Sequence, residues 1–307
     1  MRASELGCRL VALTGWALVG AGLLALGLAS TTQLLPHDVA YLGMTVEELC
    51  GRHDCRVVRF MAHDRTAFGG SLLSIGLLYQ WLARFPLRGG ERWAWWTLFA
   101  SGLAGFASFL AYLGYGYLDV WHGRATLALL PAFVAGLALA WPRGAPPAAP
   151  PGVAAGGRAL AHGRALLVFV ALGMMAAGGT IMAVGMTRVF VPQDLEYMRL
   201  APADLEALTP RLVPLIAHDR AGFGGGLLSA GIAILGAAWF GARRRDPRLW
   251  RVLLAAGSAG FGSALGVHFL IGYTSFSHLV PAYAGAAVFA LSITRLHRPM
   301  VGLAAPQ

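Results

Sequence analysis

The chain has 307 residues, of which 57% are hydrophobic and only 12% charged, with a mean hydropathy of +0.62. Too little polar surface remains to cover a soluble globule, so the composition excludes an ordinary water-soluble domain and indicates a polytopic membrane protein. The formal net charge is +10, carried by arginine without any lysine. Because arginines of a membrane protein mark its cytoplasmic loops, we expect the lipid bilayer and no nucleic acid as the partner of this charge.

Eight apolar runs are about 18 residues or longer, the length that a helix needs to cross roughly 30 Å of hydrocarbon. An unpaired peptide group costs several kcal/mol in lipid, so we expect these runs to be helices. The predicted spans cover residues 9–30, 66–86, 93–113, 125–142, 165–186, 221–241, 249–270 and 279–296.

The placement of the arginines predicts the orientation. With a cytoplasmic N-terminus, the inner segments carry 15 arginines and three acids, whereas the outer segments carry nine arginines and 11 acids. The two sides then differ as +12 against −2, which follows the positive-inside rule. We therefore expect a protein of the plasma (inner) membrane with both termini in the cytoplasm, its arginines facing anionic lipid.

The sequence repeats itself at an offset of 155 to 156 residues. Its clearest copies are two His-Asp-Arg blocks, each placed directly before an apolar run. They are His63-Asp64-Arg65 and His218-Asp219-Arg220. The predicted fold is thus an all-α integral membrane protein, with eight transmembrane helices as two tandem four-helix bundles. Four is an even number, so both halves insert in the same orientation and are related by a pseudo-twofold axis along the membrane normal.

The repeat also predicts the domain organisation. Residues 1–142 form the first four-helix half, with an outer loop at 31–62. A Pro/Ala/Gly-rich cytoplasmic linker at 143–164 leads to the second half, residues 165–307, with an outer loop at 187–217. Each outer loop contains a short amphipathic stretch, at 46–49 and 202–208, which we expect to lie as a cap on the membrane surface.

Four histidines fall at equivalent places in the two halves: His63, His122, His218 and His278. In the predicted topology they open the even-numbered helices at their outer ends. A histidine pair from two facing helices of a bundle can supply both axial nitrogens of a haem. We therefore expect haem bound by His63 with His122 and by His218 with His278.

Small residues follow the first histidine of each half on the same helical face. They are Gly70 and Ser74 in the first half, and Gly225 and Ser229 in the second. Such a face permits the close approach of a flat macrocycle or of another helix.

A second interpretation gives the His-Asp-Arg blocks no chemistry. Asp64 and Asp219 would then favour the helix macrodipole, and the arginines would reach to lipid headgroups. If the blocks do carry chemistry, Asp64 and Asp219 are candidates for catalytic groups. The counterpart of His268 is Leu113, so we expect a local packing or hydrogen-bonding role for this histidine. A mononuclear copper or zinc site is an alternative to haem, but no H-E-x-x-H or paired C-x-x-C motif is present.

Two cysteines, Cys50 and Cys55, lie close together in the first outer loop. If that loop faces an oxidising compartment, we expect a disulfide between them.

Eight helices in two tandem halves, the four histidines and the loop cysteines together resemble the heme A synthase family. The resemblance implies a haem-dependent membrane oxidoreductase with haem held by a histidine pair in each half. One half would hold a resident haem b, and the other would oxidise a methyl group of a haem substrate. The family places a glutamate three residues before the first histidine, where this chain has Phe60 and, in the second half, Leu215.

The first functional hypothesis is therefore a haem-binding membrane protein that works with a respiratory-chain or haem-handling partner. The first alternative is a small-molecule transporter, because tandem repeats are frequent in carriers, although no predicted span has an acid in its central part. The second alternative is a non-catalytic assembly or scaffold protein, whose glycine-rich helix faces pack against a partner.

Overall fold

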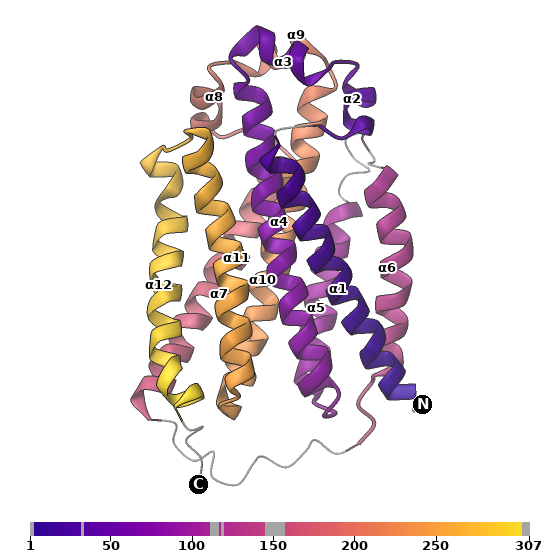
Figure 1. The fold of residues 1–307 in the computed structure, drawn as a ribbon, viewed down its shortest axis with the longest axis vertical. Coiled ribbons are helices and arrows are strands. Elements are labelled where there is room, and N and C mark those ends of the chain that lie inside the picture. Colours follow the sequence, from indigo (N-terminus) through magenta and orange to yellow (C-terminus); the bar gives the residue numbers. More distant parts are fainter. Residues whose placement is uncertain (1–2, 32–33, 111–116, 118–119, 145–156, 303–307) are drawn as a thin grey trace.

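The computed structural model describes residues 3–31, 34–110, 117, 120–144 and 157–302, and every regular element in these ranges is a helix. The long helices run side by side along the longest axis of the molecule (Figure 1). They are α1 (Ala3–Ser30), α4 (Arg56–Leu82), α5 (Arg92–Leu110), α6 (Val120–Leu139), α7 (Arg158–Gly185), α10 (Leu212–Trp239), α11 (Pro247–Ile271) and α12 (Phe276–Val301).

Four short helices gather at one end of the bundle, which we call the capped end (Figure 1). They are α2 (Pro36–Leu42), α3 (Val46–His53), α8 (Pro192–Met198) and α9 (Pro202–Leu208). At the opposite end, the terminal end, α1 begins and α12 ends. The amphipathic stretches noted at 46–49 and 202–208 lie in α3 and α9 at the capped end, whereas α2 and α8 were not predicted.

Six helices in the described part of the chain are long and apolar enough to cross a membrane. They are α1, α6, α7, α10 together with the turn after it, α11 and α12. The prediction of an all-helical membrane protein is confirmed at this level. The two remaining long helices, α4 and α5, lie alongside the six (Figure 1).

The His-Asp-Arg blocks do not open their helices, contrary to the sequence prediction. The predicted spans began at residues 66 and 221, but α4 begins at Arg56 and α10 at Leu212. The helices are preceded by Cys55 and Arg211, so a helix-start role for Asp64 and Asp219 is wrong. The hydropathy pattern placed the start of each predicted span directly after the charged residues of its His-Asp-Arg block. The helices continue because those charges are paired with one another inside the protein.

The segment predicted as a linker, 143–164, is partly helical. Helix α7 begins at Arg158, so the last seven residues of that segment belong to the first long helix of the second half. Residues 145–156 lie outside the described part of the chain.

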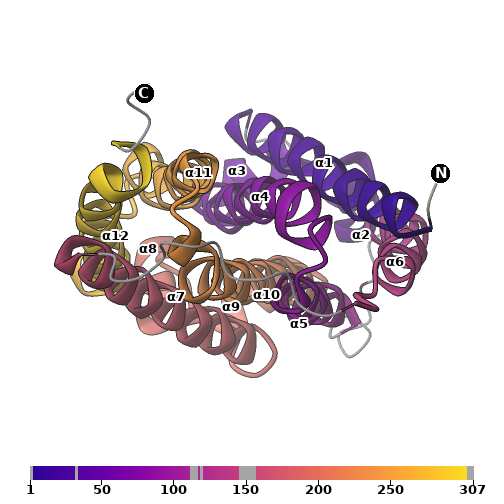
Figure 2. The same ribbon diagram turned by 90° about the horizontal axis from the view of Figure 1, so that it is seen from below.

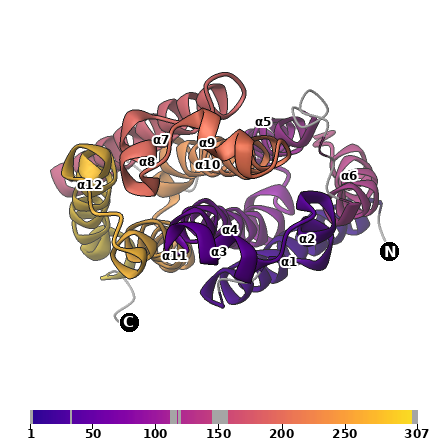
Figure 3. The same cartoon turned by 90° about the horizontal axis from the view of Figure 1, so that it is seen from above.

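The two halves are interleaved and do not form two separate four-helix bundles. Helix α4 packs against α1 of its own half and against α11 of the other half. Helix α10 likewise packs against α7 and, across the halves, against α5, while α4 and α10 contact each other at the centre (Figures 2 and 3). Each half therefore completes the packing of the other.

Small side chains permit these crossings between the halves. A Cβ atom added to Gly70 of α4 would lie 1.7 Å from Oγ of Ser263 in α11, and one added to Gly225 of α10 would lie 2.1 Å from Cβ of Ser108 in α5. Helix–helix packing in lipid gains little from hydrophobicity and depends on such close approach. The small faces noted in the sequence thus accommodate a neighbouring helix and not a macrocycle.

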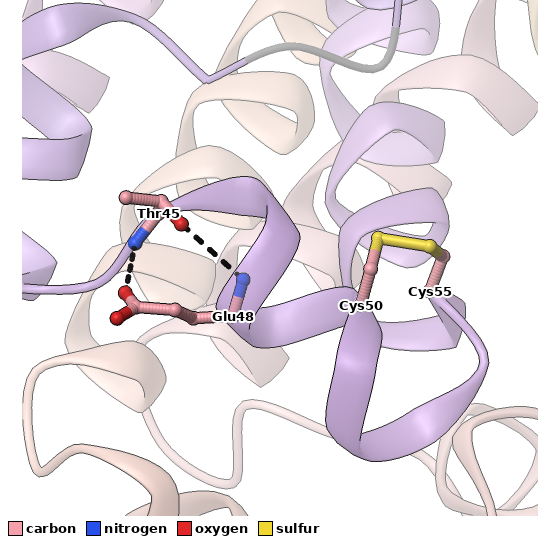
Figure 4. The surroundings of a disulfide bond; sticks show 4 residues. All are labelled: Thr45, Glu48, Cys50 and Cys55. Carbon is pink, nitrogen blue, oxygen red and sulfur yellow. Dashed lines mark hydrogen bonds between the residues drawn. A yellow bond between two sulfur atoms is a disulfide. The ribbon is translucent and has the colours of Figure 1, made fainter.

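The disulfide predicted between Cys50 and Cys55 is present and closes the turn between α3 and α4 (Figure 4). At the start of α3, the hydroxyl of Thr45 accepts a hydrogen bond from the backbone of Glu48, whose carboxylate accepts one from the backbone of Thr45. This reciprocal cap and the disulfide fix α3 at both ends.

The crossings can be tested with single methyl groups. Gly70→Ala and Gly225→Ala each force α4 or α10 away from its partner in the other half, because the added atom meets the neighbouring helix. We expect each substitution to destabilise the protein by about 1–3 kcal/mol, measured as a lower midpoint of thermal unfolding in detergent.

Gly173→Ala in α7 is the matched control, since a Cβ atom there meets nothing within 4 Å. It should leave the midpoint unchanged or raise it slightly, because alanine favours helix more than glycine does. Equal midpoints for all three variants would contradict the interleaved packing.

Candidate functional site

Two chains of buried ion pairs join the halves near the capped end. In the first, Arg65 contacts Asp38 through Nη1 and Asp219 through Nε, both at 2.7 Å. The arginine and the aspartate of the two His-Asp-Arg blocks therefore bind across the α4–α10 contact and not within their own block.

The second chain has the same order of contacts. Arg220 contacts Asp194 through Nη1 at 2.5 Å and Asp64 through Nε at 3.4 Å. Arg220 is 5% exposed and Asp64 1% exposed, so these charges are removed from solvent. Buried ions are tolerated only where they are paired and hydrogen-bonded, as they are here.

The two aspartates that are not part of a His-Asp-Arg block, Asp38 and Asp194, also anchor the short helices. Asp38 accepts a hydrogen bond from the backbone of Leu35 at the start of α2, and Asp194 accepts one from Val191 at the start of α8. Each of these carboxylates thus caps a short helix and also binds an arginine of a long helix. The short helices at the capped end are therefore held against the long helices.

Two tyrosines complete the network. Tyr117 donates to Asp38 at 2.7 Å, and Tyr273 donates to Asp194 at 2.8 Å. Burial and the negative charge of Asp194 raise the pKa of Tyr273, so its hydroxyl stays protonated and remains a donor. The network has four carboxylates and two guanidinium groups, and its formal charge of −2 favours a cation nearby.

Three histidines from three helices meet beside this network. They are His63 of α4, His268 of α11 and His278 of α12, with one ligand nitrogen of each within 4.8 Å of the others. His63 is 4% and His268 6% exposed. Imidazole nitrogens are common ligands of zinc, copper and iron, so this cluster has the donor set of a transition-metal site.

A hydrogen bond of His268 and an ion-pair contact of His63 direct lone pairs toward the centre of the cluster. Nδ1 of His268 donates to the carbonyl of Ala264 at 2.6 Å, which leaves Nε2 of the neutral ring as an acceptor. Nδ1 of His63 lies 3.0 Å from a carboxylate oxygen of Asp64, which favours a proton on that nitrogen. The two Nε2 atoms then face each other at 2.9 Å. A proton or a metal cation between them relieves the repulsion of their lone pairs.

The other two of the four repeated histidines, His122 and His218, form a separate pair on the other side of the α4–α10 contact. Nδ1 of His122 in α6 lies 3.2 Å from Nε2 of His218 in α10, and the two rings stack at 25°. Tyr117 lies against His218, just as Tyr273 lies against His278 in the three-histidine cluster. A small gap lies beside His122 and His218, and Arg65 and Asp219 of the first ion-pair chain also line it.

The histidine pairs expected from the sequence are wrong in their partners. We expected His63 with His122 and His218 with His278, one pair within each half. The structure instead brings His63 to His278 and His218 to His122, because α4 and α10 each face the other half as well as their own. All four histidines do lie near the capped end, but each cluster draws on both halves.

A haem does not fit either cluster in this arrangement. The gap beside His122 and His218 measures about 10 Å³, room for about one water molecule, whereas pockets for small-molecule ligands and cofactors occupy roughly 300 Å³ or more. Two nitrogens on opposite faces of one iron would lie about 4 Å apart, given metal–imidazole bonds of about 2.0–2.1 Å. In the other cluster, the close approach of His268 to His63 occupies space that a porphyrin ring would need.

Several residues of the site were missed or misjudged in the sequence. His268 forms the kind of local hydrogen bond that was expected, to the carbonyl of Ala264, but its contact with His63 across the halves was missed. Asp38 and Asp194 lie 156 residues apart, at the repeat offset, but nothing in their spacing indicated that they bind arginines. Tyr117 and Tyr273 lie 156 residues apart, so the same repeat offset was the available signal for them.

Compared with protein-family models, curated proteins and solved structures, the chain has no match. The resemblance to heme A synthase therefore rests on the order of the predicted helices, the four histidines and the loop cysteines of this sequence.

Arg220→Ala tests the buried ion-pair chains. It leaves the carboxylates of Asp64 and Asp194 buried without their cation, so we expect a loss of about 3–5 kcal/mol in the free energy of unfolding, measured by titration of the detergent-solubilised protein with a denaturing detergent.

Arg59→Ala removes an exposed arginine from α4 as the control, and its effect should stay within about 0.5 kcal/mol. If both variants unfolded at the same fraction of denaturing detergent, the stabilising role of the ion-pair chains would be contradicted.

Proposed function

We propose that the chain crosses the plasma membrane eight times, with α4 and α5 as the seventh and eighth spans beside the six most apolar helices. Both termini would face the cytoplasm, and the capped end would face the outside. The charge difference of +12 against −2 supports this orientation. The disulfide at the capped end also supports it, because disulfides persist in oxidising compartments.

We further propose that the two halves are equivalent and related by a twofold axis along the membrane normal, close to the contact of α4 with α10. Recurring contacts support this symmetry. Trp95 donates to the carbonyl of Leu137 in the first half, and Trp250 donates to that of Ile293 in the second.

Our proposed function is a membrane protein with a metal centre near its outer face, formed by His63, His268 and His278. The observation that carries this proposal is the meeting of three buried or half-buried imidazoles from three helices, with ligand nitrogens within 4.8 Å. Three nitrogens around one tetrahedral ion lie about 3.3 Å apart, so small rotations of these side chains would suffice.

The residues around the cluster suit a metal of the zinc or copper type. Asp64 lies behind His63 and the Ala264 carbonyl behind His268, which is the outer support that orients ligating histidines. The neighbouring ion-pair chain of Asp64, Asp194 and Arg220 has a formal charge of −1, which also favours a cation at the cluster. With three protein ligands, the fourth position would be open to water or a substrate, as in catalytic zinc sites.

Haem remains the alternative, and the pair His122 and His218 is its better candidate. Their stacked rings present two nitrogen donors from facing helices, which is the donor set of a six-coordinate haem. Helix α6 lies at the edge of the bundle, mainly against α1, so an outward movement of α6 would be the way to admit a macrocycle (Figure 3). A heme A synthase-like oxidation would require this site to open.

Metal analysis of the purified protein tests the main proposal. We expect about one zinc or copper ion per chain after dialysis against the metal, and a loss of that ion in His63→Ala and His268→Ala. Asp64→Asn should keep the site but weaken metal affinity about 10- to 100-fold, because it removes the outer support of one ligand. Elemental analysis and the electron paramagnetic resonance spectrum of the copper-loaded protein are the measurements.

His162→Ala, on the exposed surface of α7, and His122→Ala, in the other cluster, are the controls and should keep the ion. Equal metal content in all these variants, or none in the wild type, would refute the metal centre. The second outcome would leave a shared proton between His63 and His268 as the explanation of their contact.

The absorbance spectrum separates haem from a single ion. After expression with ample haem, a Soret band that disappears in His122→Ala and His218→Ala but persists in His268→Ala would favour the alternative. A colourless protein that binds zinc or copper would favour the three-histidine centre.

A further inference from the structure

The terminal end of the bundle contains a pocket of about 450 Å³ between the two halves. One wall is the turn Ala83–Leu87 after α4 and the loop that leads into α5. The other wall is the end of the turn Gly241–Arg244 and the start of α11. A pocket of this volume is large enough for a small polar ligand or a headgroup.

Positive charge predominates in this pocket, which is lined by four arginines and two acids. The arginines are Arg84, Arg88, Arg244 and Arg248, and the acids are Glu91 and Asp246. Because these arginines line one pocket, their positive charges can together attract a single anionic ligand.

Both acids are already engaged by the protein. Glu91 forms an ion pair with Nη1 of Arg244 at 2.7 Å and accepts a hydrogen bond from the indole of Trp93. Asp246 accepts from the backbone of Arg248 at 2.9 Å, which caps α11, and from the indole of Trp81 at 3.1 Å. The acids therefore hold the walls of the pocket together.

Two of the arginines keep their charge available. The guanidinium of Arg248 lies 4.6 Å from the ring centre of Phe85, and that of Arg84 lies 5.7 Å from the ring centre of Trp16. Neither forms an ion pair with an acid of the described chain. Stacking on an aromatic ring orients a guanidinium without neutralising it, so both groups can bind an anion.

The surroundings place this pocket at the level of lipid headgroups. Trp141, just after α6, and Trp239, at the end of α10, are 40% and 48% exposed at the same end of the bundle. Exposed tryptophans at helix ends are typical of the membrane–water interface. Basic pockets between helices at that level are suited to phosphate-bearing headgroups.

We propose that this terminal-end pocket binds the phosphate of an anionic phospholipid, with Arg84 and Arg248 as its ion partners. Phe85 and Pro86, which line the same pocket, provide apolar surface for the glycerol and the first methylene groups. Because the pocket is built from both halves, the lipid would link them at the terminal end, as the ion-pair chains do near the capped end.

Native mass spectrometry of the full-length protein, purified in mild detergent with phosphatidylglycerol or phosphatidylcholine, tests the proposal. We expect phosphatidylglycerol to be retained and to raise the thermal midpoint, and phosphatidylcholine to do neither. Arg84→Ala/Arg248→Ala should reduce this retention roughly tenfold or more. Arg84→Gln/Arg248→Gln, which keeps most of the side-chain stem, should behave likewise if the alanine variant folds poorly.

Arg295→Ala/Arg298→Ala is the matched control, since it removes two exposed arginines of α12 that do not line the pocket. It should retain the lipid as the wild type does. Inorganic phosphate at the same concentration should not raise the midpoint. The proposal is overturned if the pocket variants keep phosphatidylglycerol, or if phosphate alone reproduces the shift, because the ligand would then be a free anion.

Discussion

The pairing of each His-Asp-Arg block with the other is the interaction on which the capped end of the structure depends. Arg65 binds Asp219 and Arg220 binds Asp64, so neither helix can satisfy its own charges alone. A buried guanidinium without its carboxylates would cost several kcal/mol, which makes the contact of α4 with α10 a requirement. The network also reaches Asp38 and Asp194, so the short surface helices are positioned by the same charges.

This constraint explains why the halves are interleaved. With α4 and α10 held together at the centre, the third long helix of each half packs on the second long helix of the other. Gly70 and Gly225 make room for these crossings, since any side chain there would separate the helices. The histidines follow their helices, and so the two clusters are each formed by both halves.

The two histidine clusters are related in position but differ in composition. Both contain a histidine from a His-Asp-Arg block, a histidine from an outermost helix and a tyrosine that binds an aspartate of the network. The three-histidine cluster also contains His268, whose counterpart in the sequence repeat is Leu113. One added imidazole changes a pair into a three-nitrogen cluster. The two sides therefore differ in the nitrogen donors that they offer.

The sequence by itself determined the class of protein, the helices and the repeated residues, because hydropathy, helix length and self-similarity are local properties. It also identified Cys50 and Cys55, since residues so close in the chain can meet without help from the fold. Only the tertiary structure decided which histidines meet, that α4 and α10 extend through their charges, and that Asp38 and Asp194 bind arginines. These outcomes depend on which helices lie side by side, and a repeated sequence allows pairing within a half as readily as pairing between halves.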